Sequence, residues 1–127
     1  LKYMDEKGTL TTIEKGKQQV PPEQYEKNLE ALVLRMQKTG AALIWCSTTP
    51  VPEGSKGRIP ADAAKYNAIA KKVMDKHGIP TDDLYAFALP RLKEIQRPAN
   101  VHFTADGSKA LAEQVAAAVL KALAEKK

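Results

Sequence analysis

The sequence lacks several features that particular classes of protein require. Its single cysteine, Cys46, excludes an internal disulfide and a metal cage built from several cysteines. Aromatic residues make up only 6% and are not interleaved with a tight basic cluster, which argues against a stacking platform for nucleic acid. No run is long and apolar enough to span a membrane, and the first residues lack the segments of a signal peptide, so they assign no compartment.

The chain carries an excess of positive charge, with a formal net charge of +5 over 127 residues. Its lysines are spread along helical segments, mostly opposite the apolar positions, which is typical of solvated helix faces. Nucleic-acid binding is therefore the weaker interpretation of the charge, and we expect no nucleic-acid partner. No glycine-rich phosphate loop and no metal-ligand spacing is present, so neither a cofactor nor a metal is expected.

The pattern of apolar residues predicts an α/β domain with a parallel sheet. The length suits one domain. We expect a loop over residues 1–20, a helix from Pro21-Pro22 to Gly40, and a buried strand over Ala41–Cys46. A long loop, a helix over Ala61–His77 and a short strand within Ile79–Asp83 follow. The remaining segments are a helical pattern over Leu84–Ile95 interrupted by Pro90, a loop over Gln96–Phe103, and a final helix capped by Thr104. The buried stripe expected on this final helix consists of Leu111, Val115, Ala118, Val119 and Ala122.

Two strands are too few for a sheet that is covered on both faces. Leu43, Ile44 and Trp45 would need neighbouring strands on both edges, so residues 1–127 are expected to form the second half of a domain. Leu1 stands where a native start would place methionine, which predicts a processed or partial chain. An unpaired edge of this strand would favour association with other chains.

His102 is the residue most informative about chemistry. It lies on a loop just before the final helix, where a histidine can reach over the ends of sheet strands and act as a general base. A loop histidine that only packs or caps is the alternative on position alone. Asn100, two residues earlier, could orient the imidazole ring.

The segment from Asn100 to Ala112 resembles the last conserved block of SGNH (GDSL-like) ester hydrolases. That block has a histidine, a short turn with glycine and a closing helix, matched here by His102, Gly107 and the final helical pattern. Three further segments match the family in order: Glu23–Leu29, Leu43-Ile44-Trp45 leading into Thr48–Pro52, and Asp83-Leu84-Tyr85. The resemblance implies the C-terminal part of a three-layer α/β/α fold.

The departures from the family are equally specific. The Gly-Asp-Ser block that bears the nucleophile has no counterpart, and the glycine and asparagine of the oxyanion hole would also lie upstream of Leu1. The family's aspartate stands three residues before the histidine, where this chain has Ala99. A serine–histidine dyad, or a carboxylate from elsewhere, is then implied for the complete protein.

Other candidate residues have simpler interpretations. Thr48, Thr49, Pro50 and Val51 follow the buried strand and could line a substrate cleft, although turn chemistry explains them equally well. His77 is interpreted as a solvated helix cap, Asp82-Asp83 as a helix N-cap, and Cys46 as a packed thiol.

Two functions from different classes follow. The first is a C-terminal fragment of a serine esterase that cleaves small acyl esters, with acetyl groups on carbohydrates as one candidate substrate. In this function His102 is the general base, and the fragment alone is expected to be inactive. The second is a non-catalytic α/β binding or interaction module. Sequence upstream of Leu1 distinguishes them, because only the first requires a Gly-Asp-Ser block roughly 80–130 residues earlier.

Overall fold

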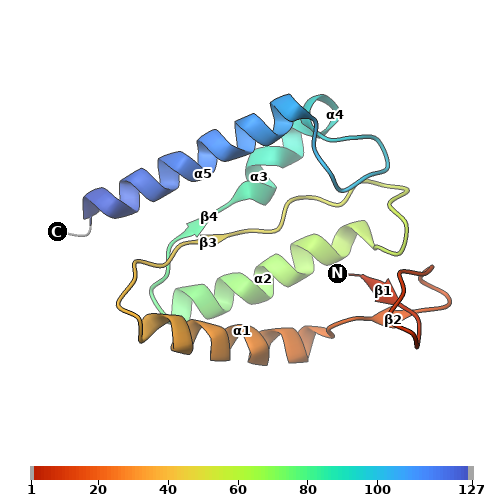
Figure 1. The fold of residues 1–127 in the computed structure, drawn as a ribbon, viewed down its shortest axis with the longest axis horizontal. Helices are drawn as coiled ribbons and strands as arrows, with labels where there is room; N and C mark the ends of the chain where they lie inside the picture. Colours follow the sequence, from red (N-terminus) through yellow and green to blue (C-terminus); the bar gives the residue numbers. More distant parts are fainter. Residues whose placement is uncertain (1, 126–127) are drawn as a thin grey trace.

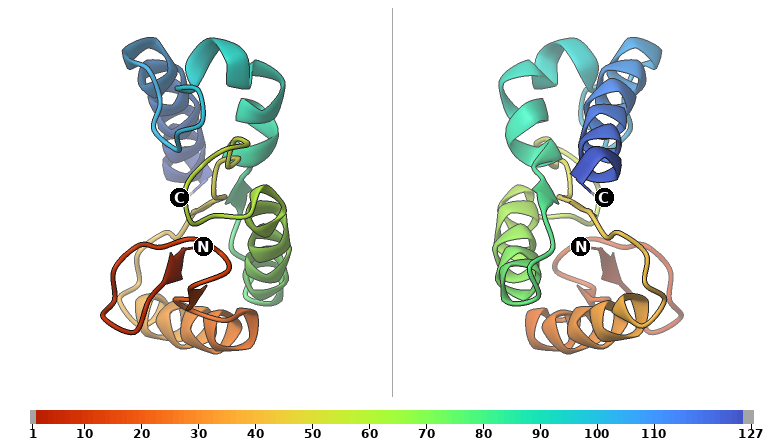
Figure 2. Two further views of the ribbon diagram at one scale, coloured as in Figure 1. Left: turned by 90° about the vertical axis from the view of Figure 1, so that its right-hand side faces the viewer. Right: turned by 90° about the vertical axis from the view of Figure 1, so that its left-hand side faces the viewer.

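The fold is a mixed α/β arrangement in which two short parallel strands lie between helices (Figures 1 and 2). It comes from a computed structural model that describes residues 2–125. Below the strands in Figure 1 lie α1 (Pro22–Gln37) and α2 (Pro60–Lys76). Above them lie α3 (Leu84–Ala88), α4 (Leu92–Ile95) and α5 (Ala105–Glu125). The predicted α/β class and parallel pairing are confirmed.

The two central strands are shorter than the apolar run predicted. β3 (Trp45–Cys46) pairs in parallel with β4 (Thr81–Asp82), and Trp45 faces Thr81 across the pair. Ala41 to Ile44 have no strand partner, so the expected strand over Ala41–Cys46 is wrong in its first four residues. Within residues 2–125 no strand pairs with the other edge of β3.

The main cluster of buried apolar side chains lies on one side of the strands, whereas Ala88 of α3 and Ile95 of α4 are buried on the other side. The main cluster consists of buried residues of α1, α2 and the turn after α2, joined by half-buried neighbours: Leu29, Val33, Ala70, Val73, Met74 and Ile79, with Tyr25, Leu43 and Trp45. The Tyr25 and Tyr66 rings meet edge to face at 5.0 Å between centroids and fix α1 against α2. Leu32 and Met36 of α1 are 53% and 42% exposed because α1 packs against α2 along a narrow stripe.

On the other side of the strands, α5 is only thinly covered. Gly107 is its only buried residue, and Leu111, Val115, Ala118 and Ala122 of the predicted stripe are half-buried. Val119 is 42% exposed, which corrects its place in that stripe, and Leu120 and Leu123 are 67% and 60% exposed. Helix α5 contacts α3 and α4, which lie beside its first turns in Figure 1, so its second half projects past them.

Residues 2–20 form a hairpin-like segment and not the plain loop expected. β1 (Tyr3–Met4) and β2 (Lys17–Gln18) pair antiparallel. Strands of two residues are too short to show an alternating pattern, which is why the sequence did not reveal them.

The segment before the candidate site follows its prediction closely. The helical pattern of Leu84–Ile95 is divided into α3, a single 3-10 turn η1 (Leu89–Arg91) and α4. Pro90 lies in the middle turn, where its missing N–H interrupts the helix. This break carries the chain round to the loop that bears His102.

Candidate functional site

The loop that bears His102 is closed by backbone hydrogen bonds at its base. Gln96 and Phe103 form an antiparallel bridge, and the Arg97 N–H donates to the His102 carbonyl at 3.0 Å. Thr104 then starts α5, because its Oγ1 accepts the Gly107 N–H at 3.0 Å, as the sequence predicted for a cap. His102 therefore projects from a short, tied loop at the helix start, and its side chain is exposed.

Asn100 holds the imidazole of His102 in one orientation. Its Oδ1 accepts the His102 backbone N–H at 2.9 Å and lies 2.6 Å from Nδ1 of the same residue. An atom that accepts the backbone N–H must be the amide oxygen, so Nδ1 carries the proton and donates to it. Nε2 is then the ring's acceptor, which is the form that a general base requires.

Ala99 occupies the position where the resembling family has its aspartate. Its backbone is left-handed, with φ of 49°, a conformation that costs an alanine roughly 1–2 kcal/mol. The methyl group cannot accept a proton or stabilise an imidazolium. The chain within residues 2–125 therefore offers an amide, Asn100, as the polar partner of the His102 ring.

The segment Thr48–Val51 is anchored by an asparagine of α2. The Thr48 N–H donates to Asn67 Oδ1 at 2.8 Å, and Asn67 Nδ2 donates to the Thr48 carbonyl at 2.7 Å. Thr48 and Thr49 are half-buried, whereas Pro50 and Val51 are buried. Of the four predicted substrate contacts, the two threonines keep accessible surface in this chain.

One residue that the sequence did not point to joins the two candidate segments. Gln96 is 5% exposed, and its Nε2 donates to the Pro50 carbonyl at 3.1 Å. A glutamine followed by Arg97-Pro98 at the end of a helical pattern is typical of exposed positions. No feature of the sequence marks it as buried.

None of the three serines has a partner suited to a nucleophile within the described residues. Ser47 is buried, and its Oγ donates to Asp83 Oδ1 at 2.8 Å and accepts the Tyr85 N–H at 2.9 Å. Ser55 is buried with an unpartnered Oγ, and Ser108 lies in the first turn of α5. The ring of His102 is bonded to Asn100 and to no serine.

The two adjacent aspartates have different roles. Asp83 is the N-cap of α3, accepting the Ala86 N–H at 3.1 Å, as predicted. Asp82 is not a cap: it is 6% exposed and accepts a hydrogen bond from Gln114 Nε2 of α5 at 2.8 Å. Burial, and then the nearby Asp82 carboxylate, raise the pKa of the Cys46 thiol, which fits a packed thiol and not a nucleophile.

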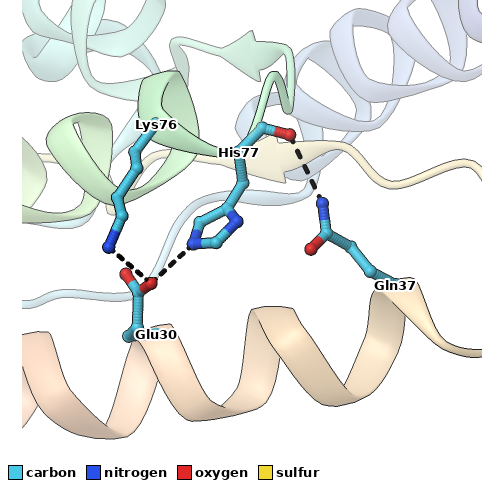
Figure 3. A network of polar contacts seen from close by, with 4 residues as sticks. All are labelled: Glu30, Gln37, Lys76 and His77. Carbon is cyan, nitrogen blue, oxygen red and sulfur yellow. Dashed lines mark hydrogen bonds and ion pairs between the residues drawn. The ribbon is translucent and has the colours of Figure 1, made fainter.

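His77 lies away from this site, between α1 and α2 (Figure 3). Its backbone N–H caps the end of α2, but the side chain is only 12% exposed and its Nε2 lies 2.7 Å from Glu30 Oε1. Lys76 reaches the same oxygen at 2.8 Å. The cap interpretation holds, while the solvated one is wrong, because the ring pairs with a carboxylate of the neighbouring helix.

Within residues 2–125 no three His, Cys, Asp or Glu side chains are grouped closely enough to hold a metal ion. In the same range no helix combines the length and apolarity needed to cross a bilayer.

The architecture is similar to that of two solved hydrolases. An α/β hydrolase enzyme from the metagenome of Lake Arreo, Spain, matches 78% of this chain with a TM-score of 0.64 and 23% identity. An acetyl xylan esterase matches 77% with a TM-score of 0.63 and 22% identity. This chain shares its fold with part of each.

The match covers only part of the two hydrolases. This chain spans 47% of the first solved chain and 55% of the second, about half the length of each. No protein-family model matches the sequence, and no curated protein does. The likeness therefore concerns the α/β fold.

Proposed function

We propose that this chain is the C-terminal, histidine-bearing part of an SGNH-type serine ester hydrolase. The observation that carries the proposal is the state of His102, whose Nδ1 donates to Asn100 Oδ1 and whose Nε2 has no hydrogen-bond partner within residues 2–125. Residues 1–127 are then a partial domain that lacks the nucleophile. The fold shared with two solved hydrolases supports this assignment.

His102 would act as the proton carrier of acyl transfer. A serine hydroxyl from the other half of the fold attacks the ester carbonyl carbon, and Nε2 of His102 takes the hydroxyl proton. The alcohol leaves with that proton, and water then hydrolyses the acyl-serine by the same route in reverse. The oxyanion donors, like the nucleophile, belong to the part outside residues 1–127.

Asn100 makes a dyad with His102 chemically workable. In a chymotrypsin-type triad, replacing the carboxylate by an amide lowers kcat about 10⁴-fold, because the amide stabilises the wrong tautomer. Here the second hydrogen bond, from the His102 backbone N–H, fixes the amide oxygen toward Nδ1 and keeps the tautomer correct. Only the charge stabilisation of the imidazolium is then missing.

The proposed substrates are small acyl esters, with acetyl groups on carbohydrates as the first class to test. One solved neighbour is an acetyl xylan esterase, which supports this choice. Thr48 and Thr49 are the proposed contacts to the substrate, and Pro50 and Val51 are the buried residues that follow them. No cofactor is required for this chemistry.

The proposed partner of this chain is the polypeptide that completes the sheet. The open edge of β3 offers unpaired backbone groups, and α5 exposes Leu120 and Leu123. A helix with apolar residues on most of its faces is normally buried. The same two surfaces favour the second candidate function, an interaction module without catalysis.

The deciding experiment compares two proteins from one reading frame. The first is residues 1–127, and the second is extended upstream of Leu1 through the Gly-Asp-Ser block expected roughly 80–130 residues earlier. With p-nitrophenyl acetate and acetylated xylan, residues 1–127 should show no turnover above background, and the extended protein should hydrolyse esters.

Substitution of His102 then tests the residue itself. In the extended protein, His102→Ala should lower kcat roughly 10³-fold or more. His77→Ala is the matched control, because its ring pairs with Glu30, and the folded fraction should keep its kcat. Absence of ester hydrolysis by a folded extended protein would favour the interaction module, and a folded His102→Ala enzyme with over half its activity would end the catalytic assignment.

A further inference from the structure

Gln96 lies at the junction between α4 and the loop that bears His102. Its backbone N–H donates to the Leu92 carbonyl at 2.9 Å, and its backbone pairs with Phe103 across the loop. The side chain points inward, and only 5% of the residue is exposed. A buried amide in this place is fixed by the hydrogen bonds that it makes.

The two hydrogens of the Gln96 amide reach two different segments. Nε2 donates to the Pro50 carbonyl at 3.1 Å and, at a longer 3.4 Å, to the Val101 carbonyl. Both acceptors are backbone carbonyl oxygens, which only accept, so the nitrogen must face them. One side chain therefore ties the segment after β3 to the residue preceding His102.

Within residues 2–125 the oxygen of the Gln96 amide adds no hydrogen bond to this tie. Gln96 Oε1 is buried and has no hydrogen-bond partner in the described part of the chain. A buried acceptor without a partner is unfavourable, and an apolar side chain of the same shape would avoid that penalty. The amide thus gains nothing from its oxygen here, and its contribution lies in the two bonds from Nε2.

We infer that Gln96 is the positioning residue of His102, setting the imidazole relative to Thr48 and Thr49. The inference rests on the proposed function for its catalytic meaning. The hydrogen bond to Val101 fixes the turn in which Asn100 contacts the His102 ring. The hydrogen bond to Pro50 fixes the position of that turn relative to the proposed substrate segment, Thr48–Val51. Displacement of a catalytic group by about 1 Å can lower a rate about 10²-fold.

The test uses residues 1–127 with labelled histidine ring nitrogens and Gln96→Met, which keeps the shape and removes the donor. At pH 8 the parent should show His102 mainly as the Nδ1–H tautomer, and Gln96→Met should raise the Nε2–H population at least threefold. The chain has two histidines, so His77, bonded to Glu30, is an internal reference that should not change.

Gln114→Met is the matched control. It removes a glutamine amide that donates to Asp82 Oδ1 at 2.8 Å, on α5 and away from the histidine loop. It should lower the urea midpoint of unfolding to a similar extent while leaving the His102 tautomer as in the parent. A purely structural role for Gln96 predicts the same spectrum for both variants, and that result would overturn the inference.

A second variant and a direct measurement keep the test decisive. Gln96→Leu is of similar size, and its side chain cannot donate, so it should reproduce the tautomer change at pH 8. If neither variant folds, the parent decides: nuclear Overhauser contacts from the Gln96 side-chain amide to Pro50 and Val101 support the inference, and their absence overturns it. Neither readout requires ester hydrolysis.

In the extended protein, Gln96→Met should lower kcat about 10- to 100-fold with KM within about twofold, because the loss concerns the proton-transfer geometry. If the extended protein without any substitution hydrolyses no ester, while Gln96→Met changes the His102 tautomer, the proposed function fails and the positioning role of Gln96 stands. If it hydrolyses esters and Gln96→Met leaves kcat unchanged, the inference fails alone.

Discussion

Replacing Gly107 by alanine tests how the end of α4 is held against the start of α5. Gly107 is buried in the first turns of α5, directly over the carbonyl group of Ile95. A Cβ at this position would lie 2.8 Å from Ile95 Cβ and closer still to the Ile95 carbonyl oxygen. That oxygen cannot move freely, because it accepts both the N–H and the hydroxyl of Thr104 at 2.9 and 3.1 Å.

Two opposing effects determine the size of the change. Alanine is better than glycine in a helix by roughly 1 kcal/mol. Overpacking typically costs about 1–3 kcal/mol, and the upper value applies here because the neighbour is hydrogen-bonded backbone. The free energy of unfolding should therefore fall by about 2 kcal/mol. For a chain of this length that corresponds to a Tm lower by roughly 8 °C.

Urea denaturation and a thermal melt measure this change. Ser108→Ala, at the next and exposed position of the same turn, is the control and should stay within about 0.5 kcal/mol of the parent. A Gly107→Ala chain as stable as the parent, or more stable, would refute the packing of α5 on Ile95 described above.

Three further predictions concern other parts of the chain. Hydrogen bonds from Lys76 and then His77 lower the pKa of Glu30, so this carboxylate stabilises the fold at neutral pH and the benefit is lost as pH falls below its usual value of 4.5. Melts between pH 7 and pH 3 should show a smaller acid loss in Glu30→Gln, and equal losses would contradict the pairing. Thr104→Ala should lower the free energy of unfolding by about 1 kcal/mol through loss of the cap, measured by urea denaturation; no change would mean that the cap is unimportant. Residues 1–127 should self-associate in sedimentation and bind hydrophobic dyes, and Leu120→Lys with Leu123→Lys should reduce both more than Leu34→Lys on α1 does. A monodisperse parent that melts sharply above roughly 60 °C would contradict this expectation.

The elements that the sequence predicted well are those whose pattern is local. Helix α2 and the break at Pro90 follow from spacing and from proline chemistry, and the cap at Thr104 follows from a hydroxyl before a helix. Val119 was misplaced because periodicity shows which residues share a face but not whether another element covers it. The two-residue strands near the N-terminus are below the length at which alternation is visible.

The candidate site likewise contains contacts that the sequence predicts and contacts that it does not. His102 and Asn100 are two residues apart, so their contact could be anticipated from the sequence, and the structure brings them together. Gln96 and Pro50 are separated by 46 positions, and no local pattern encodes their hydrogen bond. His77 and Glu30 are a similar case, since the pairing depends on how α1 lies against α2.

The uneven distribution of buried side chains has a consequence for how the molecule opens. The interior side chains of α1 and α2 form one cluster with the turn after α2, whereas α5 has a single buried residue. Protein segments with few buried contacts open locally at a lower free energy than the whole chain. Amide hydrogen exchange should therefore be slowest in α1 and α2 and fastest in the second half of α5. The histidine loop leads directly into α5, so its order would depend on whatever covers that helix.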